Sequence, residues 1–380
     1  MKILHTADVH IGKEFAQFEN FASILRDQIK STFQKTLRLA AIEHVNAVLL
    51  AGDVFDGQGI SRSDIDFFIS AVREIDPIPV FFLPGTWTHD GFLKNPIYRS
   101  RQFLEGRPTN LTIFTSEQIE TFRIAEGRVA IHGRAVLPDS GNPLEGLTAD
   151  ATALFNIGLL HVGIALPQIP DQGSTCLLRR EDVLACGLDY LALGDWHSFR
   201  RYFQDARTIV QYPGSPERVD FGEEDNPGAV ALVRLDQGKV HVSRIPVGKF
   251  SWKQLAISCE ELASNEQLRR ELEKQANEDL ILRVKLSGTL RSKDNFNFES
   301  LQSDLSGHFA FLQIDGSDTR QEIALDKLEA EYRDNTVERA FVTLLKEALQ
   351  ETEDPAALTK LSEILRRGHA LFQGTEEIPE

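Results

Sequence analysis

The chain has 380 residues, 42% of them hydrophobic and 26% charged, and its formal net charge at pH 7 is −16. This length favours two domains over one, because single hydrophobic cores rarely grow beyond roughly 250–300 residues. The acidic balance argues against a protein that coats nucleic acid by bulk electrostatic attraction. It leaves room for a nuclease, since metal ions and a local basic strip can supply positive charge where it is needed.

The composition also indicates a cytoplasmic protein without a membrane partner. No apolar run reaches the roughly 18–20 residues that span a membrane, and the opening MKILHTADVH lacks the apolar core of a signal peptide. Cys176, Cys186 and Cys259 are an odd number without CxxC spacing. They are therefore expected to be reduced, buried thiols and not a disulfide framework or a zinc site.

Strands and helices alternate in the first part of the chain. Residues 1–7 read as a buried strand, residues 21–44 have the apolar spacing of a helix, and residues 47–50 form a second apolar run. Ser61 is expected to cap a further helix, which precedes a third strand at 78–83. This alternation predicts a layered α/β domain with reactive loops at the carboxyl ends of the strands.

The rest of the chain is first dense in strands and then changes character. The strands expected in the dense region are 111–114, 128–132, 156–161, 190–193, 208–212 and 229–242. An acidic helix at 260–277 with strands at 280–286 and 308–314 indicates a small α+β domain, and residues 326–371 look helical with a break near Asp354 and Pro355. We therefore predict a catalytic domain at 1–247, a small capping domain at 248–320 and a helical segment at 321–380.

Several predicted strands end in residues that commonly bind metal ions. These residues are Asp8 and His10, Asp53, His89 and Asp90, His161, and Asp195 and His197. Each motif is weak alone, but their shared position at strand ends strengthens the signal. Aspartate with histidine suits Mn²⁺, Fe²⁺ or Zn²⁺ more than Ca²⁺ or Mg²⁺. A central carboxylate such as Asp53 can bridge two ions about 3.5–4 Å apart, an arrangement that hydrolyses phosphoesters.

At these positions the chain resembles the calcineurin-like metallophosphoesterase superfamily, whose ordered pattern is DxH, GD, GNH(D/E), H and GHxH. The strings HTADVHIGK, NAVLLAGDVFD and QYPGSPERVDFGE are similar to the DNA-repair exonucleases of the SbcCD type, the nuclease partners of SMC-like ATPases. The resemblance covers residues 5 to about 223. It implies a four-layer sandwich of two mixed sheets flanked by helices, with a small α+β capping domain and a helical carboxyl-terminal segment.

The resemblance also implies roles for individual residues. It implies two divalent ions, with Mn²⁺ as the expected metal. Asp8, His10 and His197 are implied to hold the first ion. Asp53 is implied to bridge the two ions, and His161 to hold the second. His89 is implied to protonate or stabilise the leaving group and Asp90 to orient it, a task that suits an imidazole of near-neutral pKa.

Two departures from the family pattern fall on the second ion. The string GTWTHD has Thr88 where the family has asparagine, and GDWH has Asp195 where the family has histidine. A hydroxyl is a weaker ligand than an amide oxygen, whereas a carboxylate adds charge and favours harder ions. The second site is therefore either rebuilt around His161, Asp53 and Asp195 or lost. Alternatively, Asp195 only supports His197 or His161 by hydrogen bonding.

Three side chains near these motifs are candidate substrate contacts. Trp87 and Trp196 could stack on nucleobases, worth about 1–3 kcal/mol per base, or could anchor their own loops on the core. Arg218 could bind phosphate or be a solvated surface residue. His5 and His132 lie inside strands and are expected to be structural.

The leading hypothesis is a metal-dependent DNA nuclease in DNA repair, working beside an SMC-like coiled-coil ATPase. The resemblance implies that the small domain selects DNA ends and that the helical segment binds the ATPase; a homodimer is left open. The alternatives are a phosphodiesterase for small nucleotides and a DNA-binding or scaffold subunit with weakened catalysis.

Overall fold

A computed structural model describes residues 1–57, 59–85, 96–135, 141–164, 177–205, 207–221, 227–262, 264–290, 296–321, 325–352 and 354–373. The chain divides into two compact units. The first is Met1–Lys253 with Asp279–Ile281, and the second is Gln254–Glu278 with Leu282–Glu380. The three-part domain division expected from the sequence stays a prediction.

The first sheet has six strands in the order β14-β13-β1-β2-β3-β4. Its parallel strands are β1 (Lys2–Thr6), β2 (Ala47–Ala51), β3 (Val80–Leu83) and β4 (Leu111–Ile113). Two antiparallel strands, β13 (Ala229–Asp236) and β14 (Lys239–Pro246), extend one side. The prediction of a single strand over 229–242 is therefore wrong. The chain forms a hairpin there, because Gln237 and Gly238 adopt φ of 47° and 73°, as a two-residue hairpin turn requires.

The second sheet also has six strands, in the order β11-β12-β10-β7-β6-β5. Its parallel strands are β6 (Val129–Gly133), β7 (Phe155–His161), β10 (Tyr190–Gly194) and β12 (Ile209–Tyr212). The antiparallel edge strands β5 (Glu120–Ile124) and β11 (Arg200–Gln204) were not expected from the sequence. Both are half-exposed and polar, so they lack the continuous apolar run of a buried strand. A short pair, β8 (Gly163–Ile164) and β9 (Leu177–Leu178), lies outside both sheets.

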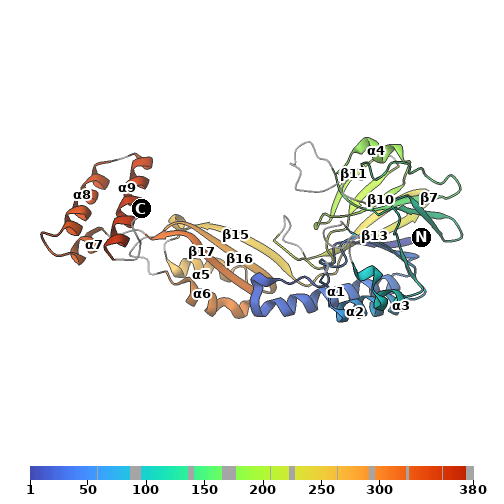
Figure 1. Ribbon diagram of the computed structural model, residues 1–380, viewed down its shortest axis with the longest axis horizontal. Helices are drawn as coiled ribbons and strands as arrows, with labels where there is room; N and C mark the ends of the chain where they lie inside the picture. Colours follow the sequence, from blue (N-terminus) through green and yellow to red (C-terminus); the bar gives the residue numbers. More distant parts are fainter. Residues whose placement is uncertain are drawn as a thin grey trace. The chain divides into compact units, whose positions relative to one another are not determined.

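The two sheets face each other across one hydrophobic core and carry helices on their outer faces. Residues such as Leu49, Phe81 and Ile157 belong to the core between the sheets, while Phe33 of α1 stacks on Phe68 of α2 on the outer face. The helical elements of this unit are η1 (Ala16–Phe21), α1 (Ala22–Ile42), α2 (Arg62–Glu74), η2 (Pro96–Arg99), α3 (Arg101–Gly106) and α4 (Arg180–Ala185). Figure 1 shows α1, α2 and α3 on one side of the paired sheets and α4 on the other. This confirms the expected four-layer arrangement.

The cap predicted for α2 is also confirmed. The side chain of Ser61 accepts a hydrogen bond of 3.1 Å from the backbone N–H of Asp64. Such a cap contributes about 1 kcal/mol to helix stability. It sets where α2 begins after the loop that leaves β2.

The second unit carries most of a three-stranded sheet in the order β15-β16-β17. Its elements are β15 (Ser251–Ser258), η3 (Cys259–Glu261), α5 (Asn265–Glu273), β16 (Asn277–Leu290), α6 (Phe298–Leu305), η4 (Ser306–His308) and β17 (Phe309–Gln321). In Figure 1, α5 and α6 lie on one face of this sheet. The acidic helix expected over 260–277 is therefore shorter, because the chain passes through η3 first and Ser264 caps α5.

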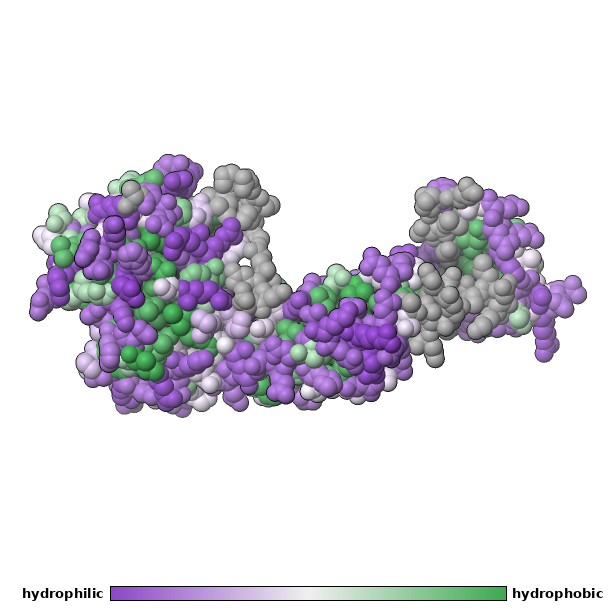
Figure 2. Space-filling view, turned by 180° about the vertical axis from the view of Figure 1, so that it is seen from behind, coloured by the Kyte–Doolittle hydropathy of each residue, from purple (hydrophilic) through white to green (hydrophobic). Residues whose placement is uncertain are grey.

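Three helices end the chain: α7 (Leu325–Glu331), α8 (Val337–Glu351) and α9 (Pro355–Phe372). The break between α8 and α9 falls where it was expected. None of the described helices is long and apolar enough to cross a lipid bilayer. On the face shown in Figure 2, hydrophilic residues cover most of the surface, with smaller hydrophobic areas between them.

Candidate metal centre

The carboxyl ends of the parallel strands β1 and β2 lie side by side, and the loops that follow these strands carry three of the predicted ligands. The backbone N–H of Asp8 donates to Gly52 O and that of His10 donates to Asp53 O, each at 3.0 Å. Because these bonds tie one loop to the other, Asp8, His10 and Asp53 are held at one edge of the sheet. The sequence expectation that these strand ends converge is met.

Several of the predicted ligands have backbones that L-amino acids rarely adopt. The φ angles are 52° at Asp8, 56° at His10, 45° at Asp53 and 104° at Asp195. Positive φ at a non-glycine residue costs on the order of 1–3 kcal/mol and persists only where the surroundings hold it. Its concentration at these residues indicates a functional site whose side-chain directions are fixed by the fold.

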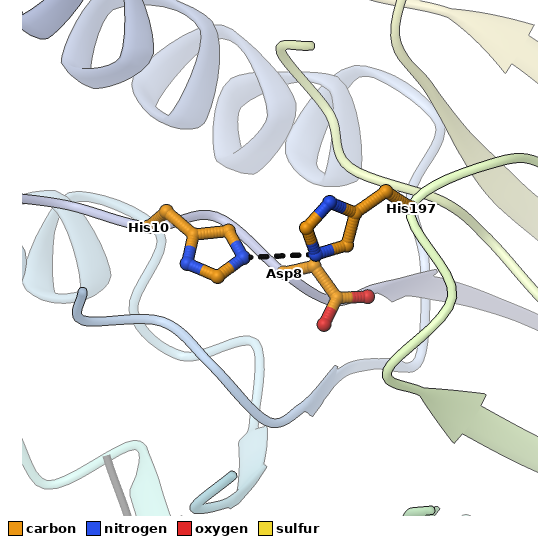
Figure 3. Close-up of side chains that lie close together, drawn as sticks. All are labelled: Asp8, His10 and His197. Atoms are coloured by element: carbon orange, nitrogen blue, oxygen red, sulfur yellow. Dashed lines mark hydrogen bonds between the residues drawn. The ribbon is translucent and has the colours of Figure 1, made fainter. Parts of the chain in front are cut away.

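The first candidate ion site consists of Asp8, His10 and His197. Their ligand atoms lie within 4.8 Å of one another. Figure 3 shows the rings of His10 and His197 turned toward each other beside Asp8, with the two Nε2 atoms 3.1 Å apart. Two nitrogens at about 2.0–2.1 Å from one ion, on adjacent coordination positions, lie about 3 Å apart. The donors therefore fit a shared ion.

Two carboxylates that were not identified from the sequence, Asp56 and Asp220, orient His10 and His197. Nδ1 of His10 donates to Asp56 Oδ1 at 2.8 Å, and Nδ1 of His197 donates to Asp220 Oδ2 at 3.2 Å. Each bond leaves Nε2 available for a metal ion. Burial raises the pKa of Asp56, but the hydrogen bond and charge of His10 and the charge of Lys13 outweigh it and hold that pKa below its usual value. The hydrogen bond from His197 likewise lowers the pKa of Asp220.

The second candidate ion site consists of Asp8, Asp53 and His161, all buried. Nδ1 of His161 donates to the carbonyl of Ala51 at 2.8 Å, so its Nε2 faces the site. This Nε2 lies 3.5 Å from Asp53 Oδ2, without a closer hydrogen-bond partner among the described residues. Two ligands at about 2.1 Å from one ion lie between about 3.0 and 4.2 Å apart, so this pair fits a shared ion as well. Asp8 belongs to both sites.

Asp195 lies beside the second site. Its Oδ1 is 4.0 Å from His161 Nε2, and its backbone N–H points at Asp8, 3.1 Å from Oδ1 and 3.2 Å from Oδ2. Burial of the carboxyl raises the pKa of Asp8. Burial lowers the pKa of His161, but the charges of Asp53, Asp8 and Asp195 together raise it well above its usual value. The site therefore concentrates negative charge that a cation would neutralise.

Glycines let these loops pack closely. A Cβ at Gly52 would overlap the ring of His161, and one at Gly194 would overlap the carbonyl of Ala51. A Cβ at Gly85 would overlap the side chain of Asp53. The glycines of the GD, GTWTHD and GDWH strings are thus required by contact with the site itself.

The other predicted site residues are placed as follows. Trp87, Thr88, His89 and Asp90 lie outside the described residues, as does Cys176. Trp196 is half-buried, and the guanidinium of Arg200 lies 5.3 Å from the centre of its ring. Arg218 is only 4% exposed.

Several known proteins are similar in sequence to this chain. A family model described as Calcineurin-like phosphoesterase matches residues 1–199. The uncharacterized metallophosphoesterase YhaO of Bacillus subtilis is 26% identical over 69% of this chain and 64% of its own length. The DNA double-strand break repair protein Mre11 of Sulfurisphaera tokodaii is 27% identical over 61% of this chain and 59% of its own length. The chain thus spans less than two thirds of either relative.

Two further matches extend the comparison. Mre11 of Sulfolobus acidocaldarius is 22% identical over 87% of both chains. The crystal structure of the protein TT1561 of Thermus thermophilus is 14% identical, with a TM-score of 0.38, over 64% of this chain and 98% of its own. The family match covers more than half of the residues, and it begins before the first metal motif and ends after the last. The chain therefore belongs to the calcineurin-like phosphoesterase family.

Proposed function

We propose that the chain is a two-ion phosphodiesterase that cleaves DNA during DNA repair. The observation that carries the proposal is the pair of donor sites that share Asp8 at the strand ends. Family membership supports phosphoester hydrolysis. The Mre11 relatives, named as DNA double-strand break repair proteins, support DNA as the substrate.

In this proposal the chain holds Mn²⁺ as the expected metal. Asp8, His10 and His197 hold one ion, and His161 with Asp195 holds the other. The bridging ligand is Asp53, as the resemblance implies, although Asp8 is the residue common to both donor groups. Divalent ions in such a pair activate water and neutralise charge on the phosphoryl group.

The chain's own residues prepare the reaction. The hydrogen bonds from Nδ1 of His10 and His197 to carboxylates fix both rings before substrate arrives. The N–H of Asp195 holds the Asp8 carboxylate from the opposite loop. His89 is proposed to give a proton to the leaving oxygen, with Asp90 orienting its ring.

Trp87 and Trp196 are proposed to contact the substrate, whereas the burial of Arg218 argues against the solvated arginine and the direct phosphate contact considered from the sequence. Trp196 is half-buried and the guanidinium of Arg200 lies over one face of its ring, so a base would stack on the other face. Arg218 is nearly buried, and its charge contributes to the low pKa of Asp220. This favours an indirect role for Arg218, in which it keeps Asp220 ionised beneath His197.

The proposed partners are DNA and an SMC-like coiled-coil ATPase, which would bind the helical segment 321–380. The buried apolar residues Leu328, Val342 and Leu365 hold α7, α8 and α9 together. Val337 and Leu344 of α8 remain 77% and 68% exposed, which leaves apolar surface for a partner. The capping domain, a homodimer and a cytoplasmic location remain predictions from the sequence.

The test of the proposal is an activity comparison with added Mn²⁺. Linear duplex and single-stranded DNA are compared with a small chromogenic diester, using the wild-type chain, Asp53→Ala and His89→Ala. We expect DNA cleavage that Mn²⁺ stimulates and that both substitutions abolish or strongly reduce. Hydrolysis of only the small diester would refute the DNA assignment in favour of a small-nucleotide phosphodiesterase.

A second candidate function is a DNA-binding scaffold with weakened catalysis. The replacements at Thr88 and Asp195 favour it, because both fall on the second ion. A purified chain that binds DNA, holds at most one divalent ion at saturating metal and shows no activity sensitive to His89→Ala would support the scaffold.

A further inference from the structure

The two candidate ion sites differ in the chemistry of their donors. The first offers two imidazole nitrogens, from His10 and His197, with the carboxylate of Asp8. The second offers one imidazole nitrogen, from His161, and the carboxylates of Asp8 and Asp53. Imidazole suits Zn²⁺ and Fe²⁺, whereas carboxylate oxygen suits Mg²⁺ and Mn²⁺. The donors alone therefore make the second site harder than the first.

Asp195 increases this difference. Asp195 directly follows β10, whose last residue, Gly194, packs against the carbonyl of Ala51. The backbone of Asp195 has a φ of 104°, and its N–H donates to the Asp8 carboxylate. Its Oδ1 lies 4.0 Å from His161 Nε2, within the range for two ligands of one ion. The Asp195 side chain is 30% exposed, so the site is open to ions from solvent on this side.

His161 independently points to a cation site beside Asp195, because its Nε2 also belongs to the donor group with Asp8 and Asp53. The residue is 2% exposed, and its Nδ1 is fixed by the carbonyl of Ala51. Its Nε2 faces two carboxylates, with Asp53 Oδ2 at 3.5 Å and Asp195 Oδ1 at 4.0 Å, so all three donors point toward one space. A divalent ion at this position would bind the buried nitrogen and the facing carboxylate oxygens directly.

We propose that Asp195 is the residue that makes the second site selective for a hard divalent ion, so that the centre holds two different metals. The first site then takes a borderline ion such as Zn²⁺ or Fe²⁺, and the second takes Mn²⁺ or Mg²⁺. This inference rests on the proposed two-ion centre and assigns the selectivity of its second half to one residue.

The test measures metal binding and not turnover. Metal-free protein is titrated calorimetrically with Mn²⁺, Mg²⁺ and Zn²⁺, and bound metals are counted by elemental analysis after exposure to an equal mixture of Mn²⁺ and Zn²⁺. The variants are Asp195→Asn, which keeps an oxygen but removes the charge, and Asp195→His, which places an imidazole there. Asp236→Asn, at the exposed end of β13, is the matched control.

We expect the wild-type chain to bind one Zn²⁺ and one Mn²⁺ from the mixture. Asp195→Asn should weaken Mn²⁺ at the second site at least about tenfold, the lower end of what a disrupted metal environment costs. Asp195→His should shift the preference of that site toward Zn²⁺ by a similar factor, and Asp236→Asn should change neither. Equal melting temperatures in chelator would show that all variants fold.

Other outcomes distinguish a failure of the inference from a failure of the proposed function. If both Asp195 variants bind the second ion with wild-type affinity and preference, Asp195 does not determine selectivity, and the two-ion centre survives. If the wild-type chain binds fewer than two ions at saturating metal, the two-ion centre itself fails and the inference fails with it. If the metal results are as expected but no DNA is cleaved, only the proposed substrate is wrong.

Discussion

Acid should weaken the first unit through His5, a fully buried histidine of β1. Its Nδ1 forms a hydrogen bond of 2.8 Å with the hydroxyl of Tyr190 on β10, so the pair joins the two sheets inside the core. Burial lowers the pKa of His5 from 6.5 to about 3. The imidazole therefore stays neutral in the folded chain at pH values where it is protonated in the unfolded chain.

The sign and size of the effect follow from this difference. Because the folded state binds the proton more weakly, the contribution of His5 to stability is complete above pH 6.5 and is lost as the pH falls toward 3. With these two pKa values, lowering the pH from about 7.5 to about 5 removes about 2 kcal/mol from the free energy of unfolding.

The perturbation is the double variant His5→Leu with Tyr190→Phe, which removes the imidazole and its hydroxyl partner together so that neither is left unsatisfied. Unfolding by urea in chelator is followed by tryptophan fluorescence at both pH values. All three tryptophans of the chain lie within residues 1–253, so the signal reports the first unit.

Between the two pH values, the free energy of unfolding of the double variant should fall by about 2 kcal/mol less than that of the wild type. Tyr190→Phe alone is the matched control, because it keeps the titrating imidazole and should lose as much as wild type. Equal losses in the double variant and in Tyr190→Phe would refute the reasoning, since the acid sensitivity would then come from other groups.

Three further predictions concern the site. Asp56→Asn should weaken ion binding at the first site by roughly 10–100-fold, because His10 loses its charged acceptor. Calorimetry measures the affinity, with the exposed Asp27→Asn as the control. Unchanged affinity would contradict this prediction. Gly52→Ala should reduce phosphodiesterase activity at least about 100-fold, because the added Cβ would displace the ring of His161. A displacement of about 1 Å at a catalytic group can have an effect of this size. Activity near that of the wild type would show that the ring can move aside. Saturating Mn²⁺ should raise the melting temperature of the first unit, since metal at about 100 times its dissociation constant adds about 2.7 kcal/mol; a melting temperature insensitive to both Mn²⁺ and chelator would argue against a metal centre.

Local patterns were enough to predict the scaffold of the site. The strand at 1–7, the helix at 21–44 and the Ser61 cap were read from apolar spacing and one short-range hydrogen bond, and the structure has all three. Buried parallel strands are continuous apolar runs, so their positions and the residues that end them are visible in sequence. The candidate ligands could be found for the same reason.

Other features are set by partners far away in the chain. The edge strands β5 and β11 carry no strong apolar pattern, and only pairing with β6 and β12 makes them strands. Asp56 and Asp220 look like ordinary loop carboxylates until the fold brings them to the histidines they orient.

The sequence by itself determined which residue types stand at the strand ends, and with them the family and its chemistry. The tertiary structure decided how these residues divide into two donor sets, that Asp8 belongs to both, and that His161 turns its Nε2 toward Asp53 and Asp195. The reason is that donor identity is a property of each residue. The direction of a donor atom instead depends on hydrogen bonds such as the one from His161 to Ala51, which cross 110 residues of chain.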